Sequence, residues 1–434
     1  MLWSKRLGAT MDDRGNGVAV DGSGNIYTIG YFNETVDFGG TSLSVFTIAG
    51  FPPASDLYYA RYSPSGVNTW AKRIGAHGVE VGTAIKVNSI GNVVITGNIG
   101  SNVDFGAGEL EGYGGWDFFV GEFDGNDGSY KWVNLLGSDG NEFCSAVALD
   151  ADDNMFITGT VVNPIDLGGG SLTGNGSQDI YVAKYAADTG AHLWSRRIGG
   201  TSTEVSNALA TDAAGNVVVV GNFNGTVDFG GGPLTSAGQA DIFVVKYEAA
   251  TGNHLWSKRL GGTSTDRAEA VAIDSNDNVI VSGEFIGSVN FGGSTLNTPN
   301  ATDDIFLAQY SPAGVHQWSR RIGGTNTDYL GDITLDIDDN VVVTGQFQNT
   351  VNFGGGGVAS AGAEDIFVAR YTPGGVFSSV KRLGGTNYEI SQSVAVDSGG
   401  DVVITGYFPG TTNLGGDPLT SAGSFDIHLV KITP

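Results

Sequence analysis

A nine-letter motif returns along this chain at a nearly constant spacing, and this repetition limits the possible folds more than any other feature. It reads HLWSRRIGG at residues 192–200, HLWSKRLGG at 254–262 and HQWSRRIGG at 316–324. Its tryptophan recurs as Trp3, Trp70, Trp132, Trp194, Trp256 and Trp318, and the seventh equivalent residue is Val380. The first spacing is 67 residues and the others are 62. Such a period indicates a repeat architecture in which each copy is one supersecondary unit.

Each period holds four short apolar runs, which in the fourth copy are NALATD, GNVVVVGNF, DIFVVKY and HLWSKRLGG. Their β-branched and aromatic residues, separated by turn residues, predict strands and leave no room for a helix. The first two runs are joined by DAAGN, and the corresponding segments DGSGN, DADDN and DIDDN keep the pattern. An Asp that caps its own turn, with Gly or Asp at a positive-φ position, predicts a tight hairpin. Each copy is therefore expected to form a four-stranded antiparallel sheet.

One repeat is divided between the two ends of the chain. The sequence begins in a fourth run, WSKRLG, and stops after a third run, DIHLVKITP. An open array would need atypical capping copies, which neither end resembles. The division is expected if residues 1–8 supply the outer strand of the C-terminal blade and close a ring. We predict an all-β, seven-bladed β-propeller over residues 1–434, a single domain with four antiparallel strands per blade and the tryptophan strands at the rim.

The three recurring motifs resemble a known family. W-S-[KR]-R-[IL]-G-G, A-V-A-V-D-x-x-G-N-V-x-V-T-G-x-F and D-I-F-V-A-[KR]-Y are similar to the SBBP repeat, a seven-bladed propeller repeat of bacterial secreted and envelope proteins. The segments AADTGAHLW and EAATGNHLW also resemble the tryptophan-docking repeat of quinoprotein-like propellers. That second resemblance implies a structural role for the repeated tryptophan, as a wedge between neighbouring blades. Quinoprotein enzymes usually have eight blades and further cofactor residues, which this sequence lacks.

The acidic residues follow the repeat. The chain has 46 acidic and 21 basic residues and a net charge of −25, which argues against nucleic acid or anionic lipid as a partner. One acidic residue precedes each hairpin by eight positions, and these residues form the first acidic set: Asp13, Glu80, Glu142, Glu204, Asp266, Asp328 and Glu389. Another opens each third run, and these form the second acidic set: Asp56, Asp117, Asp179, Asp241, Asp304, Asp365 and Asp426. Strand direction places both sets on one face of the blades, as an acidic top-face ring.

Two interpretations of these acidic sets remain open. The two residues after W-S are basic in six copies, and one of each pair is expected to reach a carboxylate of the next blade and fix blade register. Alternatively, the acidic face collects calcium or a cationic ligand. Oxygen ligands for calcium also alternate in two hairpins, at Asp150, Asp152 and Asn154 and at Asp336, Asp338 and Asn340. Because DAAGN makes the same turn with fewer oxygens, we expect no resident cofactor and keep calcium as the alternative.

Other candidate ligands and nucleophiles follow no catalytic pattern. His192, His254 and His316 occupy one repeat position on separate blades, too far apart to share a metal ion. Cys144 is the single cysteine, which excludes an intrachain disulfide, and it is expected to be a small buried hydrophobe. The sequence contains no Gly-x-Ser-x-Gly nucleophile motif.

The repeat is least regular between the second and third runs of the first two copies. Copy one takes 18 residues from Phe38 to Asp56 where most copies take 12, and the extra residues carry Phe46, Ile48 and Phe51. Copy two brings Tyr113 and Trp116 to the corresponding loop. Exposed aromatic residues on a rigid scaffold commonly mark contact sites. These five residues are predicted partner contacts, with the alternative that the long loop merely covers the edge of blade one.

The sequence thus predicts a non-enzymatic extracellular or cell-envelope module, a binding or structural scaffold whose protein or glycan partner contacts mainly the acidic top face. The competing function is a propeller enzyme, either quinoprotein-like or acting on polysaccharide at the channel mouth. A regular rim also permits self-association. No run approaches the roughly 20 apolar residues of a membrane helix, so no membrane insertion is expected. The N-terminal residues lack an apolar signal-peptide core, so either the protein stays inside the cell or the chain is a mature or excised portion of a longer protein.

Overall fold

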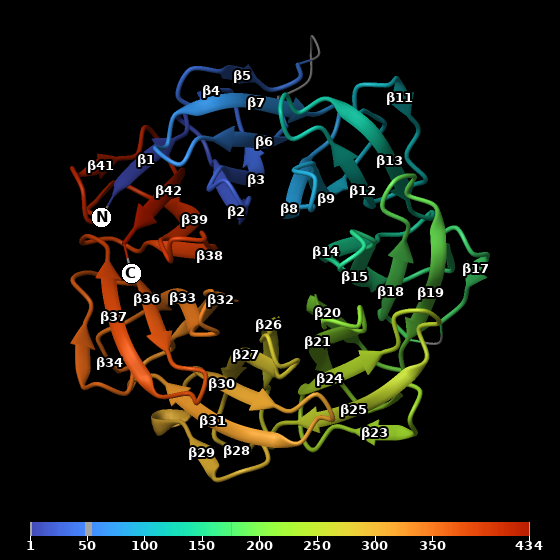
Figure 1. Ribbon diagram of the computed structural model, residues 1–434, viewed down its shortest axis with the longest axis vertical. Helices are drawn as coiled ribbons and strands as arrows, with labels where there is room; N and C mark the ends of the chain where they lie inside the picture. Colours follow the sequence, from blue (N-terminus) through green and yellow to red (C-terminus); the bar gives the residue numbers. More distant parts are fainter. Residues whose placement is uncertain (1, 48–53, 175, 434) are drawn as a thin grey trace. The chain divides into compact units, whose positions relative to one another are not determined.

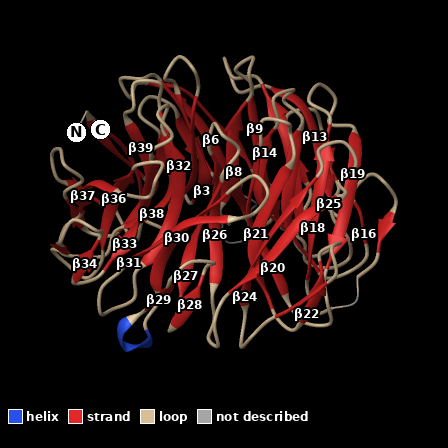
Figure 2. Cartoon of the chain, turned by 60° about the horizontal axis from the view of Figure 1, so that its bottom comes forward, coloured by secondary structure: helices blue, strands red, loops and turns tan. Residues whose placement is uncertain are grey.

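The computed structural model describes residues 2–47, 54–174 and 176–433, and in these ranges the chain is almost entirely strands and turns. It divides into two compact units. The first comprises Met1–Cys144, Ala361–Ile366 and Leu383–Pro434, and the second comprises Ser145–Ser360 and Phe367–Arg382. Figure 2 shows the predominance of strands and, beside β29, the short helix η1 (Pro299–Ala301).

The first unit contains three four-stranded antiparallel sheets within its described residues. They consist of β2 (Arg14–Val20), β3 (Ile26–Phe32), β6 (Asp56–Tyr62) and β7 (Asn68–Ile74); of β8 (Glu80–Val87), β9 (Val93–Ile99), β12 (Asp117–Phe123) and β13 (Tyr130–Leu136); and of β38 (Ile390–Val396), β39 (Val402–Phe408), β42 (Asp426–Ile432) and β1 (Trp3–Leu7).

The N-terminal strand β1 completes the sheet of the last repeat. Trp3 pairs with Lys431 and Leu7 with Ile427 in an antiparallel ladder. The backbone N–H of Leu2 extends this ladder by donating to the carbonyl of Lys431 at 2.9 Å. Figure 1 shows β1 beside β42, with β39 and β38 beyond it. The prediction that the N-terminal strand is the outer strand of the C-terminal blade is confirmed.

Four further sheets consist mainly of residues of the second unit. They are formed by β14 (Phe143–Leu149), β15 (Met155–Val161), β18 (Asp179–Tyr185) and β19 (His192–Ile198); β20 (Glu204–Thr211), β21 (Val217–Phe223), β24 (Asp241–Tyr247) and β25 (His254–Leu260); β26 (Arg267–Ile273), β27 (Val279–Phe285), β30 (Asp304–Tyr310) and β31 (His316–Ile322); and β32 (Tyr329–Leu335), β33 (Val341–Phe347), β36 (Asp365–Tyr371) and β37 (Phe377–Leu383). Across the described ranges the fold class is a seven-bladed β-propeller with four antiparallel strands per blade, as predicted.

The hairpins between the first two strands of each blade have the predicted geometry. The fourth residue of each turn has a positive φ, between 59° and 85°, at Gly24, Gly91, Asp153, Gly215, Asp277, Asp339 and Gly400. The Asp that opens the turn binds the backbone that follows it: Asp212 Oδ1 accepts the N–H groups of Ala214 and Asn216 at 3.0 and 2.8 Å. These are the local interactions that an Asp-initiated turn supplies.

A short hairpin that was not predicted follows the second strand of each blade. Its strands are β4 (Thr35–Asp37) with β5 (Ser42–Ser44), β10 (Val103–Asp104) with β11 (Glu109–Leu110), β16 (Ile165–Asp166) with β17 (Ser171–Leu172), β22 (Thr226–Asp228) with β23 (Pro233–Thr235), β28 (Ser288–Asn290) with β29 (Thr295–Asn297), β34 (Thr350–Asn352) with β35 (Gly357–Ala359), and β40 (Thr411–Thr412) with β41 (Leu419–Thr420). In the fourth copy, Phe229 is buried and its carbonyl accepts the Tyr247 hydroxyl at 3.0 Å. This bond attaches the short hairpin to the third strand.

The core lies in the second and third strands, which are buried on both faces. In β21 and β24 nearly every side chain is inaccessible to solvent. Phe229 stands edge-on to Phe223 with ring centroids 5.6 Å apart, and it lies 4.9 Å from Phe243. Burial on both faces explains why these runs are continuously apolar, since neither face must suit water.

The inner strands carry a β-bulge at one repeated position. The register with the second strand shifts around Asn16, Thr83, Asn207, Glu269, Gly331 and Gln392. Two of these residues connect neighbouring blades: Asn16 Nδ2 donates to the carbonyl of Gly82, and Asn207 Nδ2 donates to that of Ala268, each at 2.9 Å. A bulge inserts one unpaired residue and redirects its side chain, which here turns toward the next inner strand.

Candidate functional site

The repeated tryptophans lie at blade interfaces. Trp194 Nε1 donates to the carbonyl of Ala249 in the next blade at 3.0 Å. Matching bonds join Trp3 to Pro64, Trp70 to Gly125, Trp256 to Pro312 and Trp318 to Pro373. Trp132 differs, because its Nε1 donates to Glu122 Oε2 of its own blade at 3.2 Å. The motif that drew attention in the sequence therefore has a structural role.

The two basic residues that follow W-S make different contacts, and these contacts correct one prediction. One residue of each pair was expected to reach a carboxylate of the next blade, but the ion pair forms within the blade: Nη1 of Arg73 lies 3.0 Å from Asp56 Oδ2 in its own sheet. Arg73 stands opposite Tyr58 in the ladder, and Asp56 is two residues from Tyr58, so both side chains share a face. The same pairing joins Arg6 to Asp426, Arg197 to Asp179, Arg259 to Asp241 and Arg321 to Asp304.

The first residue of the basic pair is the one that faces the neighbouring blade. A β-carbon on Gly128 would lie 2.8 Å from Lys72 Cγ and 3.1 Å from the Trp70 ring. The Nζ of Lys258 in the fourth copy lies 5.8 Å from the ring centroid of Tyr310 in the fifth copy. Tryptophan and this basic residue therefore pack together on the turn of the next blade.

The first acidic set is buried and bound to backbone, which corrects the expectation of an exposed ring. Each of its seven carboxylates is 0 % exposed. Asp13 Oδ2 accepts the N–H of Ala9 at 2.7 Å and its Oδ1 accepts that of Asn33 at 2.7 Å. Glu204 Oε2 likewise accepts the N–H of Gly200 at 2.8 Å. These carboxylates hold the entry to the inner strand and do not form an acidic surface for a ligand.

The two acidic sets meet around the glycine that ends the nine-letter motif. A β-carbon on Gly261 would lie 2.8 Å from Asp241 Oδ1 and 3.0 Å from Asp266 Oδ2. Only glycine leaves space for both carboxylates there. In the first two copies, Asp56 Oδ1 and Glu80 Oε1 are buried without a hydrogen-bond partner among the described residues. A deprotonated pair would place two unsatisfied charged oxygens in a buried site.

Burial changes the acidity of these groups. It raises the pKa of Glu80 to about 7 against the lowering effect of the Ala76 N–H. It also raises the pKa of Asp13, Glu204 and Asp328 to about 7 and that of Asp266 to about 6. The exposed Asp37 of the β4–β5 turn behaves oppositely, because the N–H groups of Gly40 and Gly39 lower its pKa. Asp37 of a short hairpin is thus favoured in its ionised form, unlike the buried carboxyl groups.

The two hairpins considered for calcium are closed by nitrogen donors. Asp150 Oδ1 accepts the N–H groups of Asp152 and Asn154 at 3.0 and 2.9 Å, and Lys184 Nζ lies 2.9 Å from its Oδ2. Asp336 binds Asp338 and Asn340 in the same way, with Arg370 Nη1 at 2.8 Å from its Oδ2. Burial opposes ionisation of Asp150, but the bonds from Lys184 and Asn154 outweigh it and lower the pKa. Each turn thus contains its own cation.

Chelation is expected to leave the stability of the protein unchanged. Because Lys184 and Arg370 already neutralise Asp150 and Asp336, removing divalent ions should remove no interaction from these turns. Melting temperatures measured with excess EDTA and with added calcium should agree within error. A clear loss of stability in EDTA, restored by calcium, would contradict this expectation.

No shared metal site is formed by the histidines. His192 packs on the glycines of the short hairpin: a β-carbon on Gly169 would lie 2.4 Å from its Cε1. His192, His254 and His316 each stand edge-on to a tyrosine of their own blade, with centroids 5.8 to 6.3 Å apart. Among the residues that the structure describes, no group of three or more His, Cys, Asp or Glu could hold a metal ion. Cys144 is 1 % exposed, as predicted.

Of the predicted partner contacts in the long loop, Phe46 packs against other side chains of this protein. Its ring stands edge-on to His77 at 5.2 Å, and the Arg73 guanidinium lies 5.7 Å from its centroid. Its backbone N–H donates to Asp56 Oδ2 at 2.6 Å. Phe46 thus covers the end of β6. Ile48 and Phe51 lie outside the described residues.

Tyr113 and Trp116 lie on an ordered loop, the Tyr113 loop (residues 111–116). Tyr113 is 58 % exposed, while its N–H donates to Asp117 Oδ2 at 2.6 Å. Trp116 is half-buried, 6.1 Å from the Phe143 ring, and its N–H donates to Asn141 Oδ1 at 3.0 Å. The N–H of Gly115 also donates to the carbonyl of Gly140 at 3.0 Å. An exposed tyrosine is therefore presented on a loop held from both sides.

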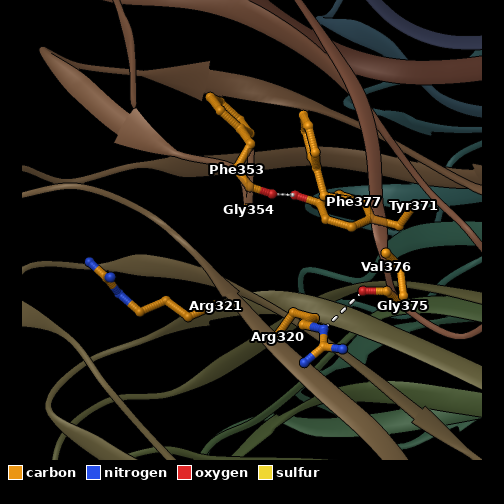
Figure 3. A pocket seen from close by; sticks show the side chains of 8 residues that line it. All are labelled: Arg320, Arg321, Phe353, Gly354, Tyr371, Gly375, Val376 and Phe377. Carbon is orange, nitrogen blue, oxygen red and sulfur yellow. Dashed lines mark hydrogen bonds between the residues drawn. The ribbon is translucent and has the colours of Figure 1, made fainter. Parts of the chain in front are cut away.

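A groove that the sequence did not predict lies in the second unit between β31 and the strands β34, β36 and β37 (Figure 3). This Arg320 groove has a volume of about 290 Å³ and is lined by Arg320, Arg321, Phe353, Gly354, Tyr371, Gly375, Val376 and Phe377. The sequence signal was present: Phe377 replaces the histidine that stands at this position in the third to fifth copies.

The fold defines a class of protein, the seven-bladed β-propellers. Residues 2–34 match the SBBP family, described as a beta-propeller repeat. This match agrees with the resemblance seen in the W-S-[KR]-R motif. In the described ranges, no helix has the length and apolarity to cross a membrane.

Two curated relatives share this sequence pattern. The chain is 27 % identical over 280 residues to an uncharacterized WD repeat-containing protein of Acanthamoeba polyphaga mimivirus, covering 54 % of this chain and 20 % of that protein. It is 28 % identical over 211 residues to the regulatory protein FlaEY of Caulobacter vibrioides, covering 46 % of this chain and 21 % of that protein. The matched region thus spans about a fifth of each relative.

Solved structures also align with most of this chain at low sequence identity. The quinohemoprotein alcohol dehydrogenase of Comamonas testosteroni aligns with 10 % identity and a TM-score of 0.46, covering 99 % of this chain and 76 % of that one.

Proposed function

We propose that this chain is a non-enzymatic binding module of an extracellular or cell-envelope protein, and that the Tyr113 loop is its contact surface. The observation that carries the proposal is the exposed Tyr113 side chain on a loop fixed by backbone bonds. Tyrosine on a pre-organised loop offers a large contact area at low entropic cost. The envelope location is part of the proposal and follows only from the resemblance of the repeated motifs to the SBBP repeat.

The charge around this loop favours a basic protein as the partner. Glu109 and Glu111 are exposed next to Tyr113, and the chain as a whole carries a charge of −25. Complementary charge steers association and excludes acidic partners. A glycan is the other partner class, and it would be recognised by stacking on Tyr113 without dependence on these glutamates.

Replacing Tyr113 is expected to weaken partner binding at least tenfold, because contacts of this kind are worth about 2 kcal/mol or more when they lie at an interface centre. The probe is a displayed peptide library, from which we expect peptides rich in Lys and Arg to be selected. The selected peptide is then titrated against Tyr113→Ala and against Tyr329→Ala, a matched control because Tyr329 is also exposed, at 40 %.

Equal affinities of the parent and both variants would overturn the assignment of the loop. Selection of acidic or uncharged peptides would overturn the basic partner. A glycan array read with the same variants separates the two classes, because Tyr113-dependent glycan binding would contradict a protein partner. Fractionation of cells that produce the full-length parent protein tests the envelope location.

A further inference from the structure

The Arg320 groove combines a positive charge without a carboxylate partner and an apolar interior. Arg320 is exposed, and its Nε donates to the carbonyl of Gly375 at 2.8 Å. The adjacent Arg321 is neutralised by Asp304, and Figure 3 shows its side chain directed away from that of Arg320. Among the described residues, no carboxylate forms an ion pair with Arg320.

The corresponding arginine of the third copy shows what is missing here. Nη2 of Arg196 donates to Asn253 Oδ1 at 3.0 Å. Val376 occupies the place of Asn253 in the sixth copy and has no acceptor to offer. The terminal N–H groups of Arg320 therefore lack the acceptor that Arg196 has.

The rest of the lining is apolar and already satisfied. Tyr371 uses its hydroxyl to donate to the Phe353 carbonyl at 2.8 Å. The Phe377 ring lies 6.0 Å from the Tyr371 ring and against Gly355, where a β-carbon would come within 2.2 Å of it. Phe353 and Tyr371 are buried whereas Val376 is 58 % exposed, so the groove runs from an apolar base to an open rim.

We propose that the Arg320 groove binds a small aromatic carboxylate, with the carboxylate on the Arg320 guanidinium and the ring against Phe377 and Val376. The volume of about 290 Å³ lies at the lower end of ligand sites, which span roughly 300–1,000 Å³, and suits a single ring. A guanidinium binds a planar carboxylate through two parallel hydrogen bonds. A sugar acid fits less well, because the lining offers few free polar groups to its hydroxyls.

Benzoate is the probe, titrated into the whole chain by isothermal calorimetry at pH 7. We expect saturable binding with a Kd on the order of 1 mM, typical of a ligand of this size. Benzyl alcohol, which keeps the ring and lacks the charge, should bind at least tenfold more weakly, and so should glucuronate. Higher ionic strength should weaken benzoate binding.

Variants locate the binding. Arg320→Gln should weaken benzoate at least tenfold, and Arg320→Lys should give an intermediate loss because the paired hydrogen bonds are removed while the charge stays. Phe377→His, which restores the residue of the third to fifth copies, should also weaken it. Arg196→Gln is the matched control and should leave the affinity unchanged.

Three results would overturn the proposal: no saturable benzoate binding, equal binding to the parent and Arg320→Gln, or tighter binding of glucuronate than of benzoate. Because Arg320 is exposed, its variants should fold, which unchanged urea midpoints would verify. The groove shares no residue with the Tyr113 loop, so its failure would leave the proposed function untouched.

Discussion

Lowering the pH from 8 to 5 is expected to stabilise this protein, in contrast to proteins whose native carboxylates are held ionised. Burial raises the pKa of Asp13, Glu80, Glu204 and Asp328 to about 7. An unfolded chain titrates these groups near 4, so between about pH 4 and 7 the folded state binds more protons. Stability is then highest when they are protonated and falls as pH rises through the folded pKa values.

Other titratable groups limit the pH range over which acid stabilises the protein. The pKa of Asp37, Asp104 and Asp166 is lowered by backbone N–H bonds, so their stabilising effect is lost as pH falls below about 4. Burial lowers the pKa of His428 to about 4, which opposes the gain below about pH 6.5. The carboxyl groups with a raised pKa outnumber the histidines with a lowered pKa. We therefore expect a stability maximum near pH 5.

The measurement is thermal unfolding at pH 8, 7, 6, 5 and 4, at low protein concentration because the isoelectric point is about 4.3. The melting temperature should rise by roughly 5 °C or more between pH 8 and 5. Glu80→Gln, which keeps the shape and removes the charge beside Asp56, should be more stable than the parent at pH 8 and less dependent on pH. Asp37→Asn is the exposed control and should give no gain. Stability that is flat or falls from pH 8 to 5 in the parent would contradict the expectation.

Truncating Trp194 is expected to cause a large loss of stability. Trp194 is 8 % exposed, its ring stands edge-on to Phe156 at 5.9 Å, and its Nε1 binds the carbonyl of Ala249 in the next blade. A β-carbon on Gly252 would approach the indole to 2.7 Å, so the ring fills the space above that turn. Trp194→Ala should therefore cost about 3–5 kcal/mol, as for other large-to-small core substitutions.

Trp194→Phe separates packing from hydrogen bonding. It keeps an aromatic ring and loses the indole N–H, and should cost about 1–2 kcal/mol, near the value of one hydrogen bond plus a little packing. Tyr113→Ala serves as a surface control, with an effect within about 0.5 kcal/mol. All three free energies come from urea unfolding followed by circular dichroism. A loss below about 1 kcal/mol for Trp194→Ala would show that the wedge is dispensable.

The features that could be predicted from the sequence are those that local chemistry decides. The Gly or Asp at the fourth hairpin position could be identified because few other residues adopt a positive φ readily. The strand order followed from the repeat, and the division of one blade between β1 and β42 followed from the phase of the repeat at the two ends.

Other features could not be predicted, because the sequence offers several similar residues for one contact and does not tell which of them makes it. Period-two alternation shows that the two basic residues of a pair point to opposite faces, but it does not tell which one meets its own blade. The ladder register decides that Arg73 joins Asp56. Exposure was misjudged for the first acidic set because backbone N–H groups four residues upstream, such as that of Ala9, give a buried carboxylate its partners.

The candidate sites likewise depend on contacts between residues that are distant in the sequence. The Arg320 groove depends on Val376 lying beside an arginine 56 positions earlier, a contact visible only after folding. Tyr113 and Trp116 could be identified as departures from the repeat, but the bonds that fix their loop could not.

At the bulged position of the inner strands the backbone register is constant from blade to blade, while the side chain varies. Asn16, Thr83, Asn207, Glu269, Gly331 and Gln392 differ in size, charge and polarity, yet the ladders on either side keep the same register shift. New chemistry can enter at such a position without disturbing the blades. The repeat thereby provides an evolvable set of sites on an unchanging frame, which is also the natural place for a designer to install a catalytic or metal-binding group.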